Sequence, residues 1–373
     1  MSGRSSGTPP RRHGAATSSS RRGRSPRRHK PSRPSGGHSD RQEGRAETRR
    51  TQRTDTGELR LALAGDTMLG RKVGERIAGN GPESLVADEV AALTLEADLF
   101  VLNLECCISE RGTPWHDPGK PFFFRAPPAA TEVLTRLGAD CVTLANNHAL
   151  DFGPQALLDT FASLQEAGVA WVGAGGNAEE ARAPVVLEKN GLRLGVIGCS
   201  DHPRDFAAGA ASPGIAYVDV RQGLGWLPEA LSRLEVDAVL VTPHWGPNMV
   251  PAPQPYVRTA AHGLLAAGAT LIAGHSAHVF HGVERGILYD LGDFLDDYAV
   301  GPERNDLGLL FFVTLDRQGP LRVEAVPLKL EYCYTRLADG DEAEWIRERF
   351  RAACAAFATS VTDEDGRVVV NWR

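Results

Sequence analysis

The sequence predicts a layered α/β fold, and three observations support this prediction. From residue 59 onward, short apolar runs alternate with amphipathic stretches, which is typical of strands and helices stacked in layers. Several of the amphipathic stretches begin near a proline and end at a glycine, as helices do. The part of the chain after residue 56 is long for one compact unit, but its length suits a large sandwich or α/β fold.

The apolar runs are the predicted strands. Each is a few residues long, rich in β-branched or leucine side chains, and bounded by glycine, proline or polar residues. We expect strands over residues 59–65, 98–103, 140–145, 169–174, 184–188, 192–198, 237–243 and 270–275, and a later series over 282–294, 307–316 and 321–332.

Helices are predicted where amphipathic stretches carry start and stop signals. Residues 132–139 follow Pro127 and Pro128, and residues 154–168 begin at Pro154 and stop at Gly168. Residues 255–268 begin at a proline and end at a glycine, and residues 341–358 predict a terminal helix.

The charge of the chain changes at about residue 56. Residues 1–56 hold 15 of the 41 Lys and Arg residues, four acidic residues and four apolar ones, so they cannot bury a core. We therefore expect a disordered basic tail of net charge +11, followed by an acidic body of net charge −17. Within this body we expect one large domain over residues 57–335 and a C-terminal helix and strand, residues 336–373, packed on it.

Composition also bears on location and partners. No apolar stretch has the length of a signal peptide or a membrane span, and residues 260–280, the least charged window, contain three histidines. The six cysteines lack CxxC or paired spacing, which indicates free thiols and predicts a cytoplasmic protein. The tail could bind polyanions, but no aromatic residue interleaves its arginines, so we do not expect nucleic acid as a partner.

Five of the apolar runs end, on their carboxyl side, in a side chain that can bind a metal ion. Strands of an α/β sheet deliver such residues to a common edge, so residues far apart in the sequence are expected to converge. Each signal alone fits a structural turn or a hydrogen-bonded histidine; the five together favour a metal site. The residues are Asp66, Asn103 with Glu105, Asn146 with Asn147 and His148, His244, and His275 with His278.

This mixture of ligands indicates the kind of metal. Carboxylate oxygen and imidazole nitrogen together suit Mn²⁺, Fe²⁺ or Zn²⁺, whereas an all-oxygen cage would suit Mg²⁺ or Ca²⁺. Two such ions can hold a hydroxide nucleophile and neutralise the oxygens of a phosphate under in-line attack. A nearby imidazole would then protonate the leaving group.

With these residues laid out, the sequence resembles the CapA capsule-synthesis family, which is associated with poly-γ-glutamate biosynthesis and has the calcineurin-like metallophosphoesterase fold. The resemblance covers residues 59 to about 300. It depends on a set of motifs in their expected order: AGDTMLGR, ADLFVLNLE, GADCVTLANNHALDFG, HWG at 244–246, GHSAHV and LYDLGDF.

The resemblance implies a four-layer α/β/β/α sandwich with ligands on loops at the strand ends. It also implies roles for particular residues, with His148 as the acid beside the metals and Asp151 orienting it. The implied metal ligands are Asp66, Glu105, Asn147, His244, His275 and His278.

The chain departs from the pattern of this superfamily at four positions. Met68 stands where Asp-x-His has its imidazole, and Glu105 stands where a bridging aspartate is usual. Asn248 lies near the place of an acid after HWG, and Asp293 replaces a usual Asn. These departures leave open whether one or two ions bind, and they bear on the substrate.

A loop after Glu105, residues 119–128, carries Lys120 and Arg125 on either side of three phenylalanines. The two cations could recruit a carboxylate or phosphate of the substrate through charge-assisted hydrogen bonds. Alternatively, the phenylalanines tuck the loop into the core and the cations are solvated.

Two functions remain open from the sequence. The first is a CapA-like metal-dependent hydrolase that uses a metal-bound hydroxide on a phosphoester or amide of an anionic, glutamate-like substrate, either a small molecule or a polymer. The second is a noncatalytic factor that binds a polyglutamate-like polymer or a biosynthetic complex, because fold and function are separable. ATP-dependent amide formation lacks support, since no phosphate-binding glycine loop is present.

Overall fold

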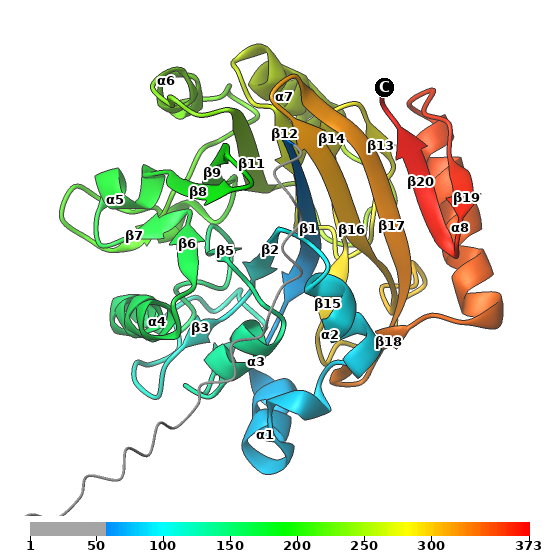
Figure 1. The fold of residues 1–373 in the computed structure, drawn as a ribbon. Coiled ribbons are helices and arrows are strands. Elements are labelled where there is room, and N and C mark those ends of the chain that lie inside the picture. Colours follow the sequence, from blue (N-terminus) through cyan, green and yellow to red (C-terminus); the bar gives the residue numbers. More distant parts are fainter. Residues whose placement is uncertain (1–56) are drawn as a thin grey trace, which may run out of the picture. The chain divides into compact units, whose positions relative to one another are not determined.

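The computed structural model describes residues 57–373, which belong to one compact unit. The predicted basic tail, residues 1–56, lies outside the described residues. Two large β-sheets form the centre of this unit (Figure 1). The larger sheet contains β1 (Glu58–Thr67), β2 (Leu99–Leu104), β5 (Cys141–Thr143), β6 (Ala170–Val172), β15 (Asp293–Leu295), β16 (Leu307–Asp316), β17 (Gly319–Glu331), β18 (Tyr334–Leu337), β19 (Thr362–Glu364) and β20 (Arg367–Asn371).

The second sheet and two small ladders complete the strands of the described residues. The second sheet contains β8 (Val185–Lys189), β9 (Leu192–Ser200), β11 (Ala238–His244), β12 (Leu271–Ala273), β13 (Val283–Glu284) and β14 (Ile287–Leu288). The ladders pair β3 (Cys107–Ile108) with β4 (Arg125–Ala126), and β7 (Ala174–Gly175) with β10 (Gly214–Ile215). Strands β1, β2, β5 and β6 are parallel, as are β9, β11, β12 and β14, so each sheet collects carboxyl ends along one edge.

The described residues contain eight α-helices, six of which cover the outer faces of the two sheets. They are α1 (Arg71–Asn80), α2 (Asp88–Thr94), α3 (Ala130–Arg136), α4 (Gly153–Ala167), α5 (Ala178–Arg182), α6 (Leu227–Ser232), α7 (Pro255–Ala266) and α8 (Gly340–Ala355), with short 3₁₀ helices at Pro82–Ser84 and Arg204–Phe206. Helices α1 to α4 pack on the larger sheet, and α6 and α7 pack on the second sheet.

Three apolar cores separate the resulting four layers. Alternation along β1 sends Leu61 and Leu63 toward the second sheet and Ala62 toward the helices, because successive strand residues face opposite sides. The inter-sheet core contains Leu61 from the larger sheet and Leu194 and Leu240 from the second. The described residues therefore form the predicted α/β/β/α sandwich, and the predicted fold class is confirmed.

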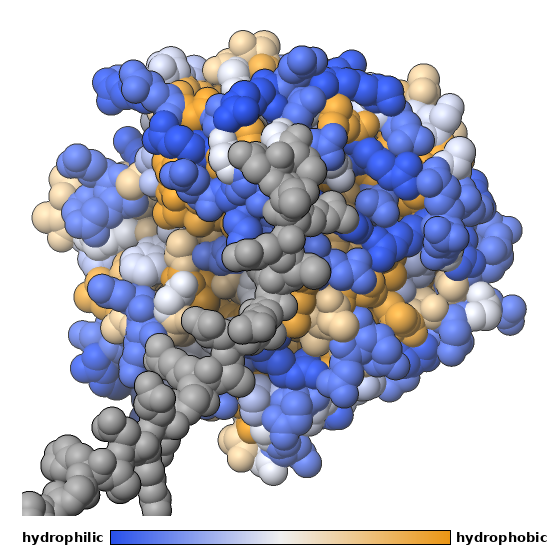
Figure 2. Space-filling model, in the orientation of Figure 1, coloured by the Kyte–Doolittle hydropathy of each residue, from blue (hydrophilic) through white to orange (hydrophobic). Residues whose placement is uncertain are grey.

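The C-terminal elements extend the larger sheet and close one side of the inter-sheet core. Strand β20 pairs with β17, and α8 lies beside β19 and β20 (Figure 1). Helix α8 buries Ala343, Ile346, Phe350 and Cys354, which share one face at spacings of three and four residues. The molecular surface on this side is mainly hydrophilic (Figure 2). No helix among residues 57–373 has the length and apolar character needed to cross a bilayer.

The structure differs from the predicted elements in a few places. The run 169–174 is divided into β6 and β7 by Gly173, whose φ of 82° is a left-handed conformation that favours glycine. The run 282–294 forms three short strands, β13 to β15, and not a single long one. Helices α1 and α2 were not predicted; α1 lacks a side-chain cap and buries Val73 and Ile77 as its only large apolar residues, so its sequence signal is weak.

Candidate metal centre

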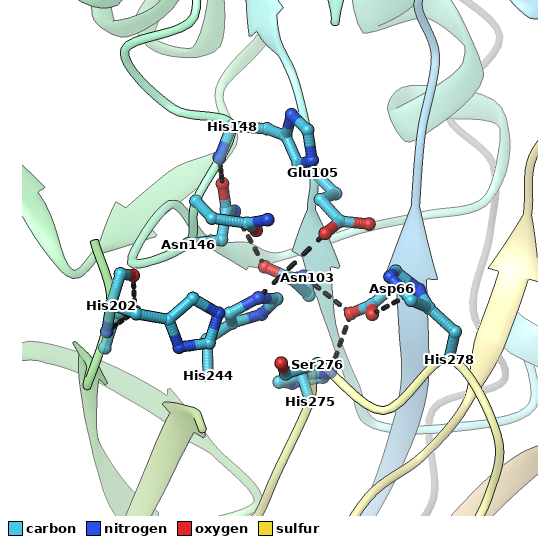
Figure 3. Close-up of polar contacts among 12 residues, drawn as sticks. Asp66, Asn103, Glu105, Asn146, His148, His202, His244, His275, Ser276 and His278 are labelled. Carbon is cyan, nitrogen blue, oxygen red and sulfur yellow. Dashed lines mark hydrogen bonds and ion pairs between the residues drawn. The ribbon is translucent and has the colours of Figure 1, made fainter. Parts of the chain in front are cut away.

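Five of the six predicted metal ligands, Asp66, Glu105, His244, His275 and His278, lie together at the carboxyl ends of the parallel strands (Figure 3). Asp66 is near the end of β1, His244 is the last residue of β11, and Glu105 directly follows β2. The loop after β12 carries His275 and His278. The loop after β5 carries Asn147, whose backbone carbonyl accepts from Lys120 Nζ. The site thus lies where the edges of the two sheets meet, because His244 and His275 also form a β-bridge in the second sheet.

Asp66 occupies the middle of this cluster. Its Oδ1 accepts a hydrogen bond from Asn103 Nδ2 at 2.7 Å and lies 3.6 Å from His275 Nδ1. Its Oδ2 lies 3.2 Å from His278 Nδ1. Burial alone would raise the pKa of Asp66, but the hydrogen bond and charge of His278 hold it below its usual value.

Glu105 lies on the other side of Asp66 and is fully buried. Its Oε1 is 4.0 Å from His244 Nε2, and its Oε2 accepts a long hydrogen bond from the Tyr298 hydroxyl at 3.4 Å. Burial, followed by the negative charge of Asp66, raises the pKa of Glu105 well above its usual value. A carboxyl group in this environment is stabilised by any cation that binds beside it.

The imidazoles of His244 and His275 are neutral near pH 7. Burial lowers the pKa of His275 to about 4 and lowers that of His244 well below its usual value. A neutral imidazole offers a lone pair to a metal without first losing a proton. His278 differs, because the charges of Asp293 and Glu105 outweigh its burial and raise its pKa.

His148 and Asp151 form a hydrogen-bonded pair beside the ligands. His148 Nδ1 is 2.6 Å from Asp151 Oδ2, and Asp151 Oδ1 pairs with Lys120 Nζ at 3.0 Å. Burial lowers the pKa of His148 to about 4, so the imidazole is neutral and donates its Nδ1 proton to the Asp151 carboxylate. The other ring nitrogen, Nε2, therefore carries the lone pair that can take up a proton.

The two predicted substrate-binding cations have different surroundings. Lys120 lies at the site, but it is largely buried and also donates to the backbone carbonyl of Asn147 at 2.7 Å. Arg125 is not brought to the site: its guanidinium lies 4.2 Å from the centre of the Phe152 ring and donates to the carbonyl of Arg111. Of the three phenylalanines between them, Phe124 is buried and stacks on His148, while Phe122 is exposed.

Several residues of the site were not among the predicted metal ligands. Asn103 and Asn146 form a hydrogen-bonded chain to Asp66, since Asn146 Nδ2 donates to Asn103 Oδ1 at 2.9 Å. The ring of His202 lies 5.2 Å from that of His244, and Gly246 N donates to Asp201 at 3.3 Å beside it. Asn103 and Asn146 stand in the same strand-end runs as the ligands, which was a usable signal. Asp201 and His202 directly follow β9, so the same strand-end signal could have found His202.

Two cavities adjoin the cluster. One of about 330 Å³ is lined by aromatic residues, His148, His278 and Arg71. The other, of about 430 Å³, is more polar and is lined by Asp201, His202, Tyr217 and Arg221 among others. Of the predicted ligands, His278 lines the first cavity, and Asn248 borders both cavities.

The donor set fits a divalent cation. Ligand atoms of Asp66, Glu105 and His244 lie within 4.8 Å of one another, as do those of Asp66, His278 and Asp293. Such spacing lets several donors reach one ion. Within the described part of the chain, the following buried atoms have no hydrogen-bond partner: Glu105 Oε1, Asn147 Oδ1, His244 Nδ1, His275 Nδ1 and Asp293 Oδ2. Met68 contributes nothing here, because its sulfur accepts from Gly70 N and its side chain lies in the apolar core.

Two facing sheets, with a carboxylate and imidazole cluster at their carboxyl ends, define a layered α/β protein with a candidate metal centre. Comparison with known proteins identifies the family: residues 60–298 match the model of the bacterial capsule synthesis protein PGA_cap. The chain belongs to this family, in agreement with the resemblance seen in the sequence.

Named relatives agree with this assignment. A probable polyglutamine synthesis accessory protein of Mycobacterium tuberculosis is 32% identical over 285 residues, which cover 71% of this chain and 74% of the relative. The PGA biosynthesis protein CapA of Bacillus subtilis is 27% identical, with 77% and 76% covered. The capsule biosynthesis protein CapA of Bacillus anthracis is 28% identical, with 73% and 68% covered.

Similar solved structures are more distant. The NAD nucleotidase of Haemophilus influenzae has a TM-score of 0.38 at 10% identity, with 79% of this chain and 56% of that chain covered. A putative 5'-nucleotidase of Staphylococcus aureus has a TM-score of 0.39 at 13% identity, with 78% and 58% covered. Both likenesses are weak at these TM-scores.

Proposed function

We propose that this protein is a metal-dependent hydrolase acting on a phosphoester or amide of an anionic, glutamate-like substrate. The observation that carries the proposal is the convergence of five potential ligands, Asp66, Glu105, His244, His275 and His278, from both sheets beside the His148–Asp151 pair. Asp66, Glu105, Asn147, His244, His275 and His278 would hold one or two divalent ions, Mn²⁺, Fe²⁺ or Zn²⁺. When bound, these ions supply positive charge for the substrate oxygens and make a water molecule more acidic.

His148 is the proposed proton donor to the leaving group. Its Nδ1 proton is held by Asp151, so its Nε2 must first receive a proton and can then pass it on. Asp151 acts as a positioning residue, because its hydrogen bond selects the tautomer and fixes the ring. Lys120 supports this arrangement by pairing with the second oxygen of Asp151 and anchoring to the backbone of Asn147.

The aromatic cavity supports an anionic substrate of modest size. It places Phe122, Phe124 and Tyr298 beside His148, and Arg71 contributes a cationic group at its edge. The Arg71 side chain is about one-third exposed and pairs with Asp297 at 3.3 Å, so part of its guanidinium faces solvent. A carboxylate of a glutamate-like molecule could bind there through charge-assisted hydrogen bonds.

The second candidate is a noncatalytic binding or assembly factor. Its support comes from the relatives, one of which is named as a synthesis accessory protein and others as capsule or PGA biosynthesis proteins. In this case the metal centre would bind a polyglutamate-like polymer or a biosynthetic complex without turning it over. For either function we propose a cytoplasmic location, supported by six buried cysteines that are all free thiols.

Elemental analysis and turnover of the full chain test the two candidates. We expect bound Mn, Fe or Zn, and Mn²⁺-dependent hydrolysis of phosphoesters or γ-glutamyl amides. His275→Ala should lose metal while keeping its fold by circular dichroism. The matched control is His262→Ala, since His262 is an exposed imidazole that pairs with Glu284 away from the cluster.

The outcomes separate the candidates. Metal without turnover of either substrate class favours the binding factor. A wild-type protein that carries no metal after growth and loading with Mn²⁺ contradicts the metal centre itself.

A further inference from the structure

A second carboxylate stands directly beside Asp66 at the end of the larger sheet. Strand β15 pairs in parallel with β1, and the register places Asp293 opposite Asp66. The approach of the two strands is very close: Asp66 N donates to the carbonyl of Gly292 at 2.9 Å, and a Cβ added to Gly65 would lie 1.8 Å from that carbonyl oxygen. Only glycine at position 65 permits this contact, so the adjacency of the two carboxylates is built into the backbone.

One imidazole connects the two carboxylates. His278 Nδ1 is 2.8 Å from Asp293 Oδ1 and 3.2 Å from Asp66 Oδ2. Donor atoms of all three residues lie within 4.8 Å of one another. A carboxylate, a second carboxylate and an imidazole at this spacing form a donor set that suits a divalent cation such as Mn²⁺.

Asp293 differs in its partners from two of the buried acids near it, Asp290 and Asp297, whereas its neighbour Asp296 also has an oxygen without a partner, Oδ2, and accepts from Tyr298 N through Oδ1. Asp297 pairs with Arg71, and both oxygens of Asp290 accept backbone N–H groups, from Ala277 and Gly292. Asp293 is 1% exposed, its Oδ2 has no hydrogen-bond partner, and no Lys or Arg of the described residues pairs with it. A buried carboxylate oxygen without a partner is costly unless something else neutralises it.

We propose that Asp293 is a further metal ligand, which joins Asp66 and His278 in holding one divalent cation. This inference rests on the proposed metal centre and extends it. Asp293 supplies a charged donor on the side of the cluster where Met68, with its sulfur bonded to Gly70 N, supplies none. The carboxylate-rich ion would lie beside β1 and β15, next to any ion held by Glu105, His244 and His275.

Mn²⁺ titration of the full chain by isothermal calorimetry, with elemental analysis of the loaded protein, tests the proposal. Asp293→Asn removes one donor charge at nearly constant volume. We expect this variant to bind Mn²⁺ at least tenfold more weakly, or to lose one equivalent, with its fold retained by circular dichroism. Asp293→Ser is a second variant with the same expected loss, in case the amide of the first cannot be accommodated.

Asp297→Asn is the matched control, because it makes the same change of charge four residues further along the chain, in a carboxylate that already has Arg71 and Lys72 N as partners. It should bind Mn²⁺ as the wild type does. Equal Mn²⁺ binding by wild type and Asp293→Asn overturns the role of Asp293 while leaving the proposed centre intact. A wild type that binds no Mn²⁺ overturns both, so the two failures are distinguishable.

Discussion

The two sides of the donor cluster have opposite chemistry. The carboxylate side contains Asp66, Asp293 and His278, where two buried acids share one imidazole. The imidazole side contains Glu105, His244 and His275, where two neutral imidazoles stand near one acid. Burial raises the pKa of Asp293 and lowers that of His275 to about 4, so burial acts in opposite directions on the two kinds of ligand.

This difference shows what each side needs from a cation. On the carboxylate side a cation displaces protons and balances the negative charge of two buried acids that share one imidazole. On the imidazole side it meets lone pairs that are already free. Asp66 touches both sides, since its two oxygens approach His275 and His278 respectively, and it therefore couples them.

Removal of Asp66 should have the largest effect, because it contributes to both sides. We expect Asp66→Ala to weaken Mn²⁺ binding on the order of a thousand-fold, beyond the 10–100-fold typical of losing an outer-sphere partner. Calorimetric titration measures this directly. If Asp66→Ala still binds one equivalent of Mn²⁺ with full affinity, the two sides bind metal independently and Asp66 does not couple them.

Removal of His148 should reduce the rate without removing the metal. We expect His148→Ala to lose about a hundred-fold or more in kcat, the usual contribution of a positioned acid or base, with unchanged metal content. The pH profile should also lose one limb, which a purely structural residue would not cause. An unchanged kcat in His148→Ala would show that His148 is not the proton donor and that catalysis depends on the metal ligands without it.

Metal affinity should increase with pH. Glu105, Asp293 and His278 all have raised pKa values in the cation-free protein, so protons shared among these groups are displaced when a cation binds. Fewer protons are bound in the loaded state, and affinity therefore rises by about tenfold per pH unit for each proton displaced. His275, with a pKa of about 4, adds no pH dependence above that value.

Calorimetric Mn²⁺ titrations between pH 5.5 and 7.5 measure the slope of the logarithm of affinity against pH. Asp293→Asn should flatten it, whereas His275→Ala should lower affinity and leave the slope intact. A wild-type slope of zero would mean that the carboxylate side holds no displaceable proton.

A smaller effect is expected at the backbone contact that sets the two carboxylates side by side. Gly65→Ala places a methyl group against the carbonyl of Gly292 and should cost about 1–3 kcal/mol of unfolding free energy. Gly79→Ala in α1 is the control, because a Cβ there meets nothing within 4 Å and alanine favours the helix. Urea unfolding compares the two variants; equal stability would show that β1 and β15 separate easily.

Much of the fold followed from local patterns in the sequence. The strand at β1 and the helices α4 and α7 were predicted with ends within two residues, because apolar periodicity and Pro and Gly signals are local properties. The split of residues 169–174 at Gly173 was not predictable, since it depends on contact with Ala145 across the sheet. Helix α1 was missed because packing, and not its own sequence, stabilises it.

The candidate site was likewise predictable only in part from the sequence. Strand-end positions identified the metal-competent residue types, but the partners of Lys120 and Arg125 depended on where a loop folds. Lys120 reaches Asp151 at the site, whereas Arg125 lies on Phe152 and points to another part of the loop. Loop side chains follow tertiary contacts, so sequence position alone did not separate the two.

Motifs along the chain were sufficient to predict the family and the side chains able to bind metal. Apolar periodicity was sufficient to predict the order of the main strands and helices. Tertiary structure decided which of those side chains share a volume and in which state of protonation. Register places Asp293 against Asp66, and burial separates the pKa values of carboxylates and imidazoles. The register arises from contact between segments more than 200 residues apart, and burial arises from packing of all the layers, neither of which a local pattern encodes.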